Sequence, residues 1–427
     1  MTSPSGPEPA AGKRNEWLLI LFTGWTNIAD AVTAVALPLL TLQLTREPLA
    51  VTAVAMMLSL PWLLTALHIG VFVDRMDRRR LLVGAQVARV ALVGLLLLTF
   101  LGGTLSLPLV YAAALFLGLA DVIASLSGVS IVPSAIPRAR WQTASARITA
   151  VEYLFNSFIG SPIGGLLVAV GFAVALTTSG LSYLLAAVLL LLLAGNFAVA
   201  RSTEPRPVHT EIRDGLVFLW RHRLLRTMAL LITIMAGCWA AWFALIPAYA
   251  VGGPLGLSAR EYGILLTCLG AGGVAGSLVV GRLNSLLGRR WSMFVDIVGT
   301  FALVAVPAIL PATPDSAWAI GAAAAVAGAG GTMWTVNSRV ITQTLVPHDM
   351  LGRFSAASRV VAWGMAPIAA LAAGALAQLV SYRLAFGAFA VLCLLLVYPF
   401  LRVITQAAVA EVDQPAPEPE PAAGSAT

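Results

Sequence analysis

Three carboxylates lie deep within apolar segments of the chain, where an ionised side chain is costly. Asp30, Glu152 and Asp121 each lie about three to four helical turns beyond the first residue of their segments, which are Trp17, Trp141 and Leu107. At 1.5 Å per helical residue these positions are roughly 16–21 Å into their segments, so the three acids share one depth. A charge in a membrane costs about 2.5–3.5 kcal/mol on insertion scales. Because desolvation favours the protonated acid, we predict that at least one of the three carries an exchangeable proton.

Four arginines and a further acid also lie in apolar segments, nearer to the ends that hold most of the basic residues. Their depth indicates ion pairing at an inner gate in preference to contact with a substrate. The members of this set are Arg89, Arg147, Asp296, Arg339 and Arg359. The alternative for the three deep acids is that each is the fixed ion-pair partner of a buried arginine.

The segments that position these residues read as membrane-spanning helices. Of the 427 residues, 59% are hydrophobic and only 11% are charged, and the mean hydropathy is +0.90. Soluble domains carry about 25% charged residues, and a bilayer-crossing helix needs roughly 20 apolar residues. The predicted spans are 17–42, 49–73, 80–101, 107–131, 141–169, 172–200, 226–251, 258–286, 290–311, 315–345, 350–379 and 382–406. The predicted fold class is therefore an all-α membrane protein with twelve transmembrane helices in two pseudo-symmetric six-helix bundles.

These spans divide the chain into five parts. We predict a cytoplasmic tail at 1–16, a six-helix bundle at 17–200, a cytoplasmic linker at 201–225, a second six-helix bundle at 226–406 and a disordered tail at 407–427. Apolar and charged residues alternate at helical spacing from His209 to Arg226, which indicates an amphipathic helix in the linker. A flexible linker is the alternative.

The loops between the spans are alternately rich and poor in arginine. The rich loops and the linker would face the cytoplasm under the positive-inside rule, so both termini are predicted to be cytoplasmic. Apart from Lys13, every basic residue that makes up the net charge of +7 is arginine, which is typical of a high-GC bacterial genome. We therefore expect a multi-pass protein of the bacterial inner membrane.

The two halves repeat in register. Gly70 and Gly281 each begin a Gly…Arg-Arg segment after the second span of their half, and the step between them matches the step from Arg147 to Arg359 to within one residue. Transporters use such duplication to rock one half against the other around a site near the membrane midplane. A receptor or scaffold would need large soluble loops, which the sequence lacks.

The loop after the second span resembles the signature of the major facilitator superfamily, and the segments Leu60–Leu63 and Val346–Arg353 resemble its macrolide-efflux and enterobactin-exporter branch. The resemblance implies a secondary transporter that exports a bulky amphiphile, such as a drug, an antibiotic or a siderophore-like product, in exchange for protons. A proton-coupled uptake symporter for a nutrient or metabolite is the alternative.

The resemblance also implies a cytoplasmic gate, in which the acid of the loop caps a helix of the other half and the arginines form salt bridges. The gate residues would be Gly70, Asp74, Arg75, Arg78, Arg79, Gly281, Gly288, Arg289 and Arg290. Asp77 stands where the family often has glycine, and Ser285 replaces the second aspartate, so we expect Asp74 to carry the acidic role alone. Anchoring of the arginines to anionic headgroups is the alternative.

The stretch Gly160, Pro162, Gly164 and Gly165 in the fifth span is similar to the motif of drug antiporters in that superfamily. Small residues allow close helix contact and proline bends a helix, so plain packing between the fifth and eighth spans is the alternative.

In this family the first, seventh and tenth helices line the cavity. Asp30 lies on the first helix and is therefore the preferred proton carrier. The substrate-cavity candidates on these helices are Trp25, Asn27, Trp239, Trp242, Phe243 and Trp334. An aromatic, weakly charged cavity suits a bulky amphiphile, whereas lipid-facing aromatics are the alternative.

Other chemistries find no support in the sequence. No nucleophile–base pair, nucleotide-binding loop, HExxH or CxxC motif is present, so we predict no enzyme, no catalytic residue and no metal site. The cysteines Cys238, Cys268 and Cys393 read as small hydrophobic residues. We expect no cofactor beyond the proton gradient, no nucleic-acid or nucleotide partner, and a monomer whose partners are a hydrophobic small molecule and the lipid bilayer.

Overall fold

The computed structural model describes residues 9–73, 76–195, 197, 208–347, 350, 354, 357–358, 361–362 and 364–406. Within these ranges the regular structure is helical, with no strand. Leucines with 69% and 79% of their surface exposed, such as Leu98 and Leu278, lie on helix faces. Such apolar surfaces fit contact with lipid better than contact with water.

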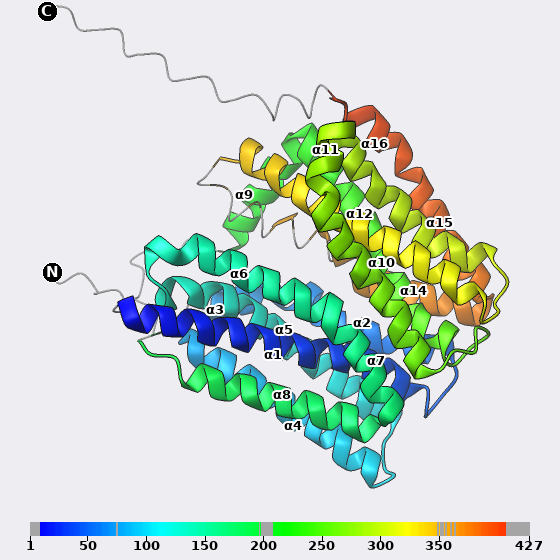
Figure 1. The fold of residues 1–427 in the computed structure, drawn as a ribbon, viewed down its shortest axis with the longest axis horizontal. Coiled ribbons are helices and arrows are strands. Elements are labelled where there is room, and N and C mark those ends of the chain that lie inside the picture. The colour runs from blue at the N-terminus through cyan, green and yellow to red at the C-terminus, as the bar shows by residue number, and fades with distance from the viewer. Residues whose placement is uncertain are drawn as a thin grey trace, which may run out of the picture.

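The first bundle is built from eight α-helices and two short segments of other helix types (Figure 1). They are α1 (Pro9–Thr41), α2 (Pro48–Leu64), α3 (Ala66–Val73), α4 (Arg78–Leu101), α5 (Leu107–Ala135), the 3₁₀-helix η1 (Arg138–Arg140), α6 (Trp141–Tyr153), the π-helix η2 (Leu154–Gly160), α7 (Ser161–Val170) and α8 (Phe172–Leu191). Asp77 starts α4 by accepting a hydrogen bond from the Arg80 amide at 3.0 Å. The first helix begins at Pro9, well before the predicted boundary at Trp17, so part of the predicted tail is helical.

The second bundle follows a helix in the predicted linker, α9 (Val208–Arg221). It consists of α10 (Arg223–Ala250), α11 (Ala259–Ile309), α12 (Ser316–Leu345), α14 (Ala366–Leu379), α15 (Tyr382–Leu395) and α16 (Val397–Val403). A capping box starts α11, in which Ser258 and Glu261 each bond the backbone of the other. Gly288 has φ 80° and ψ 157°, so α11 breaks there into two arms.

Nine helices in the described residues are long and apolar enough to cross a bilayer. One of them is α11, whose 51 residues supply two crossings once the break at Gly288 is taken into account. The shorter apolar helices α2 and α14 have 17 and 14 residues. The described helices are therefore consistent with twelve crossings.

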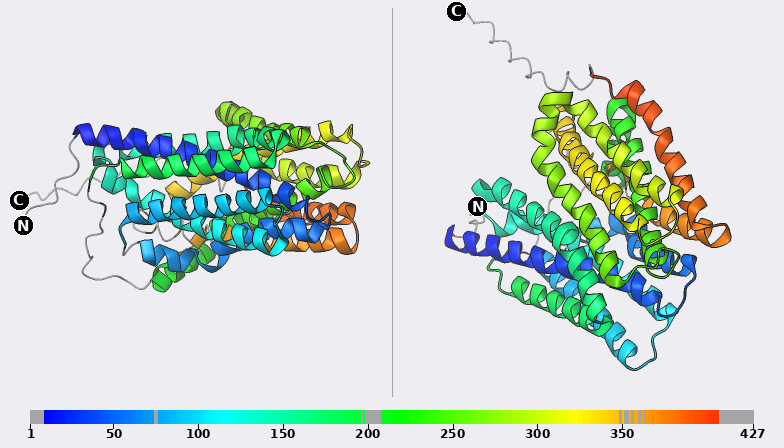
Figure 2. Two further views of the ribbon diagram at one scale, coloured as in Figure 1. Left: turned by 90° about the horizontal axis from the view of Figure 1, so that it is seen from below. Right: turned by 45° about the vertical axis from the view of Figure 1, so that its right-hand side comes forward.

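The two bundles meet at one end and diverge toward the other, like the arms of a V, and the start of α1 lies at a divergent end (Figures 1 and 2). At the closed end α7 packs against α11, and α2 packs against α14. The amide of Leu49 also donates to Gln378 Oε1 across the two bundles at 3.2 Å. The conformation is thus open toward the end where α1 begins.

Glycines bring α11 and α12 into close contact in the second bundle. A Cβ added to Gly272 would lie 1.8 Å from the Ala325 carbonyl oxygen, and one added to Gly330 would lie 2.5 Å from the Asp296 Cα. Helices that touch along their backbones in this way pack firmly without large side chains.

Candidate functional site

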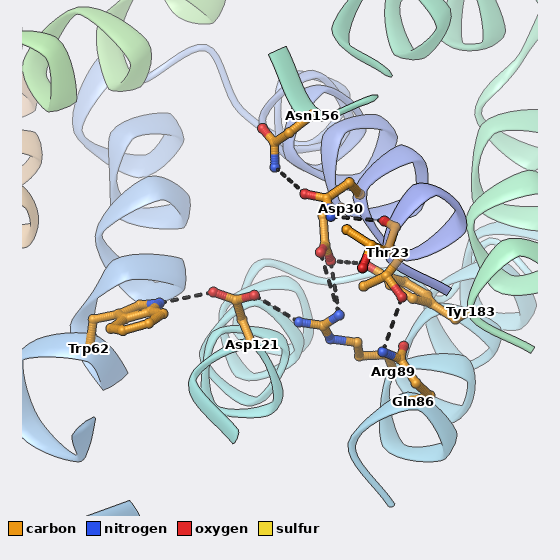
Figure 3. Close-up of polar contacts among 10 residues, drawn as sticks. Thr23, Asp30, Trp62, Gln86, Arg89, Asp121, Asn156 and Tyr183 are labelled. Atoms are coloured by element: carbon orange, nitrogen blue, oxygen red, sulfur yellow. Dashed lines mark hydrogen bonds and ion pairs between the residues drawn. The ribbon is translucent and has the colours of Figure 1, made fainter. Parts of the chain in front are cut away.

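Two of the three deep acids share one arginine in the first bundle. Arg89 on α4 places Nη2 2.8 Å from Asp121 Oδ1 on α5, and Nη1 3.2 Å from Asp30 Oδ1 on α1. Figure 3 shows the guanidinium lying between the two carboxylates. The Arg89 side chain is 1% exposed, whereas those of Asp30 and Asp121 are 26% and 39% exposed. The arginine is therefore fixed, and the acids retain access to the space around them.

Each carboxylate also accepts one hydrogen bond from a neutral aromatic donor. The Tyr183 hydroxyl on α8 donates to Asp30 Oδ1 at 2.7 Å, and Trp62 Nε1 on α2 donates to Asp121 Oδ2 at 2.9 Å (Figure 3). The Arg89 guanidinium also lies 5.2 Å from the centre of the Tyr183 ring. Five helices thus contribute to this charge cluster, which we define as Asp30, Arg89, Asp121, Tyr183 and Trp62.

Apolar packing holds the charge cluster in position. Ala29, Val93, Leu117 and Tyr183 belong to one buried core formed by α1, α4, α5 and α8. Gln86, one turn before Arg89 on α4, donates to Thr26 Oγ1 on α1 at 3.3 Å. These contacts surround the ionic groups with close-packed atoms, which limits rearrangement of the side chains.

The charge cluster has one more acid than base. Arginine is permanently charged, so the cluster carries a net charge of −1 when both carboxylates are ionised and is neutral when one proton is bound. A net charge within a membrane is expensive, and one proton removes it. The arrangement can therefore bind and release a proton.

The sequence identified Asp30 and Asp121 but assigned Arg89 to a separate, shallower set. Arg89 lies near the middle of α4 and pairs with both acids. Tyr183 and Trp62 are not predicted from the sequence. A usable signal existed for Tyr183, because it lies about three turns into α8, at the depth of the acids.

Glu152 is not a member of the charge cluster. It lies on α6 with an exposed side chain, shortly before η2 begins at Leu154. Asn156 of η2 donates to Asn27 Oδ1 of α1 at 3.1 Å, so the π-helical turn is attached to the helix that carries Asp30.

A second ionic group forms at the end of the first bundle where α1 begins. Glu16, with 1% of its side chain exposed, lies 2.7 Å from Arg140 Nη2 and 2.9 Å from Arg147 Nη1. Arg147 was expected in an inner ion pair, but its partner lies in the predicted tail. Beside it, Asn15 Nδ2 donates to the carbonyls of Ala135 and Ala194 at 3.0 and 2.7 Å.

Glu16→Gln is expected to lower the free energy of unfolding by about 1–3 kcal/mol, because two arginines then face each other without their shared carboxylate. Thermal unfolding of the purified chain in detergent measures this effect. Glu47→Gln is the matched control, since Glu47 is exposed and its side chain makes no capping bond. Equal unfolding temperatures for both variants would contradict a stabilising role of Glu16.

Comparison with known proteins decides the family. A family profile described as Major Facilitator Superfamily matches residues 18–361 and again residues 250–426. The chain belongs to the major facilitator superfamily. The predicted all-α membrane fold and the resemblance to this superfamily are thereby confirmed.

Relatives within the major facilitator superfamily cover nearly the whole chain. A protein named "Multidrug efflux pump Tap" from Mycolicibacterium fortuitum is 28% identical over 397 residues, which are 90% of this chain and 94% of that protein. The protein of the same name from Mycobacterium tuberculosis (strain ATCC 25618 / H37Rv) is 31% identical over 425 residues, or 94% of this chain and 98% of the relative. Among solved structures, the D323A mutant of the nucleoside transporter NupG superposes with a TM-score of 0.70 over 92% of this chain and all of its own, at 12% identity. That likeness supports the fold alone.

The loop motif of the superfamily is described in part, because Asp74 and Arg75 lie outside the described residues, as does Arg359 of the predicted inner ion-pair set. Arg78 Nη1 donates to Ser134 Oγ at 2.9 Å, and Arg79 Nη2 donates to the Leu191 carbonyl. Both contacts stay within the first bundle. Gly70 has open space where a side chain would be.

The second copy of the motif contains the break in α11. Gly288 adopts a positive φ that favours glycine, and Arg290 Nη2 donates to the Leu401 carbonyl at 3.2 Å. Arg289 forms an interaction as well, and Gly281 has open space beside it. Arg339 of the predicted inner set is exposed on α12.

The antiporter-like stretch packs against both α1 and the second bundle. A Cβ on Gly160 would lie 2.5 Å from Ala31 Cβ, and one on Gly164 would lie 3.1 Å from Val32 Cα. A Cβ on Gly165 would lie 2.4 Å from Gly263 Cα on α11, and Pro162 lies in the first turn of α7. Because α7 is part of the fifth span and α11 begins with the eighth, the two spans are in close contact. This is the contact that the alternative interpretation of the motif, plain helix packing, predicts. The π-helical turn before it is not predicted from the sequence.

The aromatic candidates divide into exposed and buried groups. Trp25 and Phe243 are 38% and 41% exposed, and Trp239 is half-buried. Trp242 and Trp334 are only 0% and 3% exposed and belong to the core of the second bundle. These two side chains therefore offer no accessible surface to a substrate in this conformation, contrary to expectation.

Proposed function

We propose that the chain exports bulky amphiphilic drug-like molecules by alternating access and is driven by the entry of protons. The proposal is carried by the single arginine shared by two carboxylates in the charge cluster. It is supported by family membership and by relatives that are named multidrug efflux pumps. Those names favour export over the uptake of a nutrient.

The bound proton would alter how the arginine is shared. With both acids ionised, Arg89 attracts two carboxylates; when Asp30 is protonated, Arg89 and Trp62 hold Asp121 alone. Opposite charges a few ångströms apart attract strongly where the dielectric constant is low, so the loss of one charge redistributes these contacts.

A path leads from the charge cluster to the interface between the bundles. Trp62 is bonded to Asp121, and its neighbour Leu63 would lie 3.3 Å from a Cβ added to Gly364 in the second bundle. The same helix, α2, packs against α10 and α14. Protonation of the cluster would therefore bias the position of α2 and the relative tilt of the bundles.

The arginine distribution orients the chain in the proposed transport cycle. The end where α1 begins would face the cytoplasm, and both termini would lie on the cytoplasmic side of the bacterial inner membrane. In the V-shaped conformation the bundles would then diverge toward the cytoplasm, which is the state that takes up a drug from the cell.

The proton gradient would supply the energy for this cycle, without nucleotide or cofactor. One chain in the lipid bilayer would suffice for transport.

Asp30→Asn is expected to reduce proton-driven extrusion of rhodamine 6G by at least about tenfold, since it removes a charged hydrogen-bond acceptor from the cluster. Everted membrane vesicles from a pump-deficient host measure the transport, with ethidium and erythromycin as further probes. Asp121→Asn and Glu152→Gln complete the set, and exposed Asp315→Asn is the matched control. Full proton coupling in all three acid variants would contradict the proposal, as would failure of the unaltered chain to extrude any of the three probes.

A further inference from the structure

A second polar cluster lies in the second bundle, at the position that the internal repeat assigns to Arg89. The step along the chain from Gly70 to Gly281, applied to Arg89, leads to Thr300 on α11. Thr300 Oγ1 accepts a hydrogen bond from Trp239 Nε1 of α10 at 3.0 Å. The same hydroxyl donates to Asp296 Oδ1, one turn earlier on α11, at 3.4 Å. As in the charge cluster of the first bundle, an acid and an aromatic donor lie together, but here the Thr300 hydroxyl takes the place of the Arg89 guanidinium.

Asp296 is enclosed by backbone and apolar groups. It is 2% exposed, its Cα packs against Gly330 of α12, and a Cβ on Gly331 would lie 3.8 Å from Oδ1 and 3.5 Å from the Trp239 ring. In the part of the chain that the structure describes, Asp296 takes part in none of the ion pairs. The space beside the carboxylate admits a proton but not a bulky cation.

The titratable groups around Asp296 are few. The helices packed on this arm of α11 bring the thiols of Cys238 on α10 and Cys393 on α15, and Cys393 donates to the Ile297 carbonyl at 3.5 Å. The charged residues Arg339 on α12 and Arg290 on α11 itself lie about two turns along their helices from Gly331 and Asp296, respectively. A neutral, protonated Asp296 is therefore the form that this environment accommodates.

The Trp239 ring connects this acid to an exposed aromatic side chain on the same helix. It is half-buried, and its centre lies 6.0 Å from that of Phe243, which is 41% exposed. A flat amphiphile that stacks on these rings would turn the indole and withdraw Nε1 from Thr300. The hydrogen bonds of Asp296 would change with it, because Thr300 is the shared partner.

We propose that Asp296 is a second proton-binding site, linked to the drug through Trp239 and Thr300. This inference rests on the proposed proton-driven export and adds to it. Contact of the drug with Trp239 opens the cluster, and the proton passes from the Asp296 carboxyl to water at the open end of the V. One proton leaves Asp296 and one leaves the charge cluster of the first bundle, so each drug exchanges for two protons.

The experiment counts protons released by the purified full-length chain when rhodamine 6G is added in weakly buffered detergent solution with a pH-indicating dye. Asp296→Asn is expected to release one proton fewer per chain while still binding the dye, whereas Asp315→Asn releases as many as the unaltered chain. Trp239→Phe keeps an aromatic ring but loses the indole N–H donor, and is expected to lower the proton release from Asp296 by about two- to tenfold.

Infrared difference spectra between acidic and alkaline buffer give a readout that needs no drug. The protonated-carboxyl band of Asp296 is expected to vanish in Asp296→Asn and to persist in Trp239→Phe, which also serves if the first variant fails to fold. Unchanged proton release and an unchanged band in Asp296→Asn would overturn this inference alone. No proton release from the unaltered chain on binding rhodamine 6G would instead overturn the proposed exchange itself.

Discussion

Arg89→Met should abolish proton-driven drug export and lower the free energy of unfolding by about 3–5 kcal/mol, because two half-buried carboxylates lose the buried cation that they share. Asp30 and Asp121 lie on either side of the guanidinium, which is itself 1% exposed. Without it, both acids lose the positive charge that stabilises them in this part of the bundle. Transport in everted vesicles and thermal unfolding in detergent measure the two effects separately.

Two further variants separate folding from coupling at this position. Arg89→Met combined with Asp121→Leu removes a charge of each sign, so stability should recover while coupled export stays lost. Arg89→Lys keeps the positive charge but lacks the planar guanidinium that binds two carboxylates at once. This variant should retain only part of the export rate. Wild-type export by the double variant would show that the charge cluster is structural.

Gly165→Val is expected to stop export by preventing the bundles from closing at their contact end. The first atom of any side chain at this position would lie 2.4 Å from Gly263 Cα and 3.0 Å from its backbone nitrogen. Overpacking in a firm interface costs about 1–3 kcal/mol, enough to shift a balanced two-state equilibrium by about fivefold to a hundredfold. Rhodamine 6G export should fall accordingly.

Labelling tests the cause of that loss. Leu42→Cys, at a half-buried position after α1 that packs against Gly252 at the closed end, should react faster with a membrane-impermeant thiol reagent when Gly165→Val is also present. Gly94→Val is the matched control, because nothing lies within 4 Å of a Cβ at Gly94. Unchanged labelling together with unchanged export in Gly165→Val would show that the glycine contact is dispensable for sealing.

Hydropathy predicts the membrane-spanning helices because it reports on the lipid solvent, which acts on every residue in turn, and the internal repeat adds the division into two halves. The break in α11 is an example: the sequence places a boundary between 286 and 290, where Gly288 interrupts the helix. Contacts between helices are not encoded in this way, since they depend on how each helix is rotated. Arg89 could therefore be recognised as buried from the sequence, but its pairing with Asp30 and Asp121 required the structure.

Residues with mixed character were the hardest to predict. Trp62 and Tyr183 are mostly apolar, so hydropathy hides the single polar atom by which each holds a carboxylate. Glu16 lies in what the sequence presents as a polar tail, because the first turns of α1 contain too few apolar residues to be recognised. The burial of Trp242 and Trp334 likewise depends on helix rotation, which composition does not report.

The surplus acid beside Arg89 has an electrical consequence. The charge cluster with both acids ionised and the cluster with one proton bound differ by one elementary charge, so the two states cannot both cross the membrane field without moving charge. Each charge moved across the membrane responds to the voltage by about 2.3 kcal/mol per 100 mV. A cell whose interior pH matches its surroundings could thus still expel an uncharged drug with its membrane potential alone.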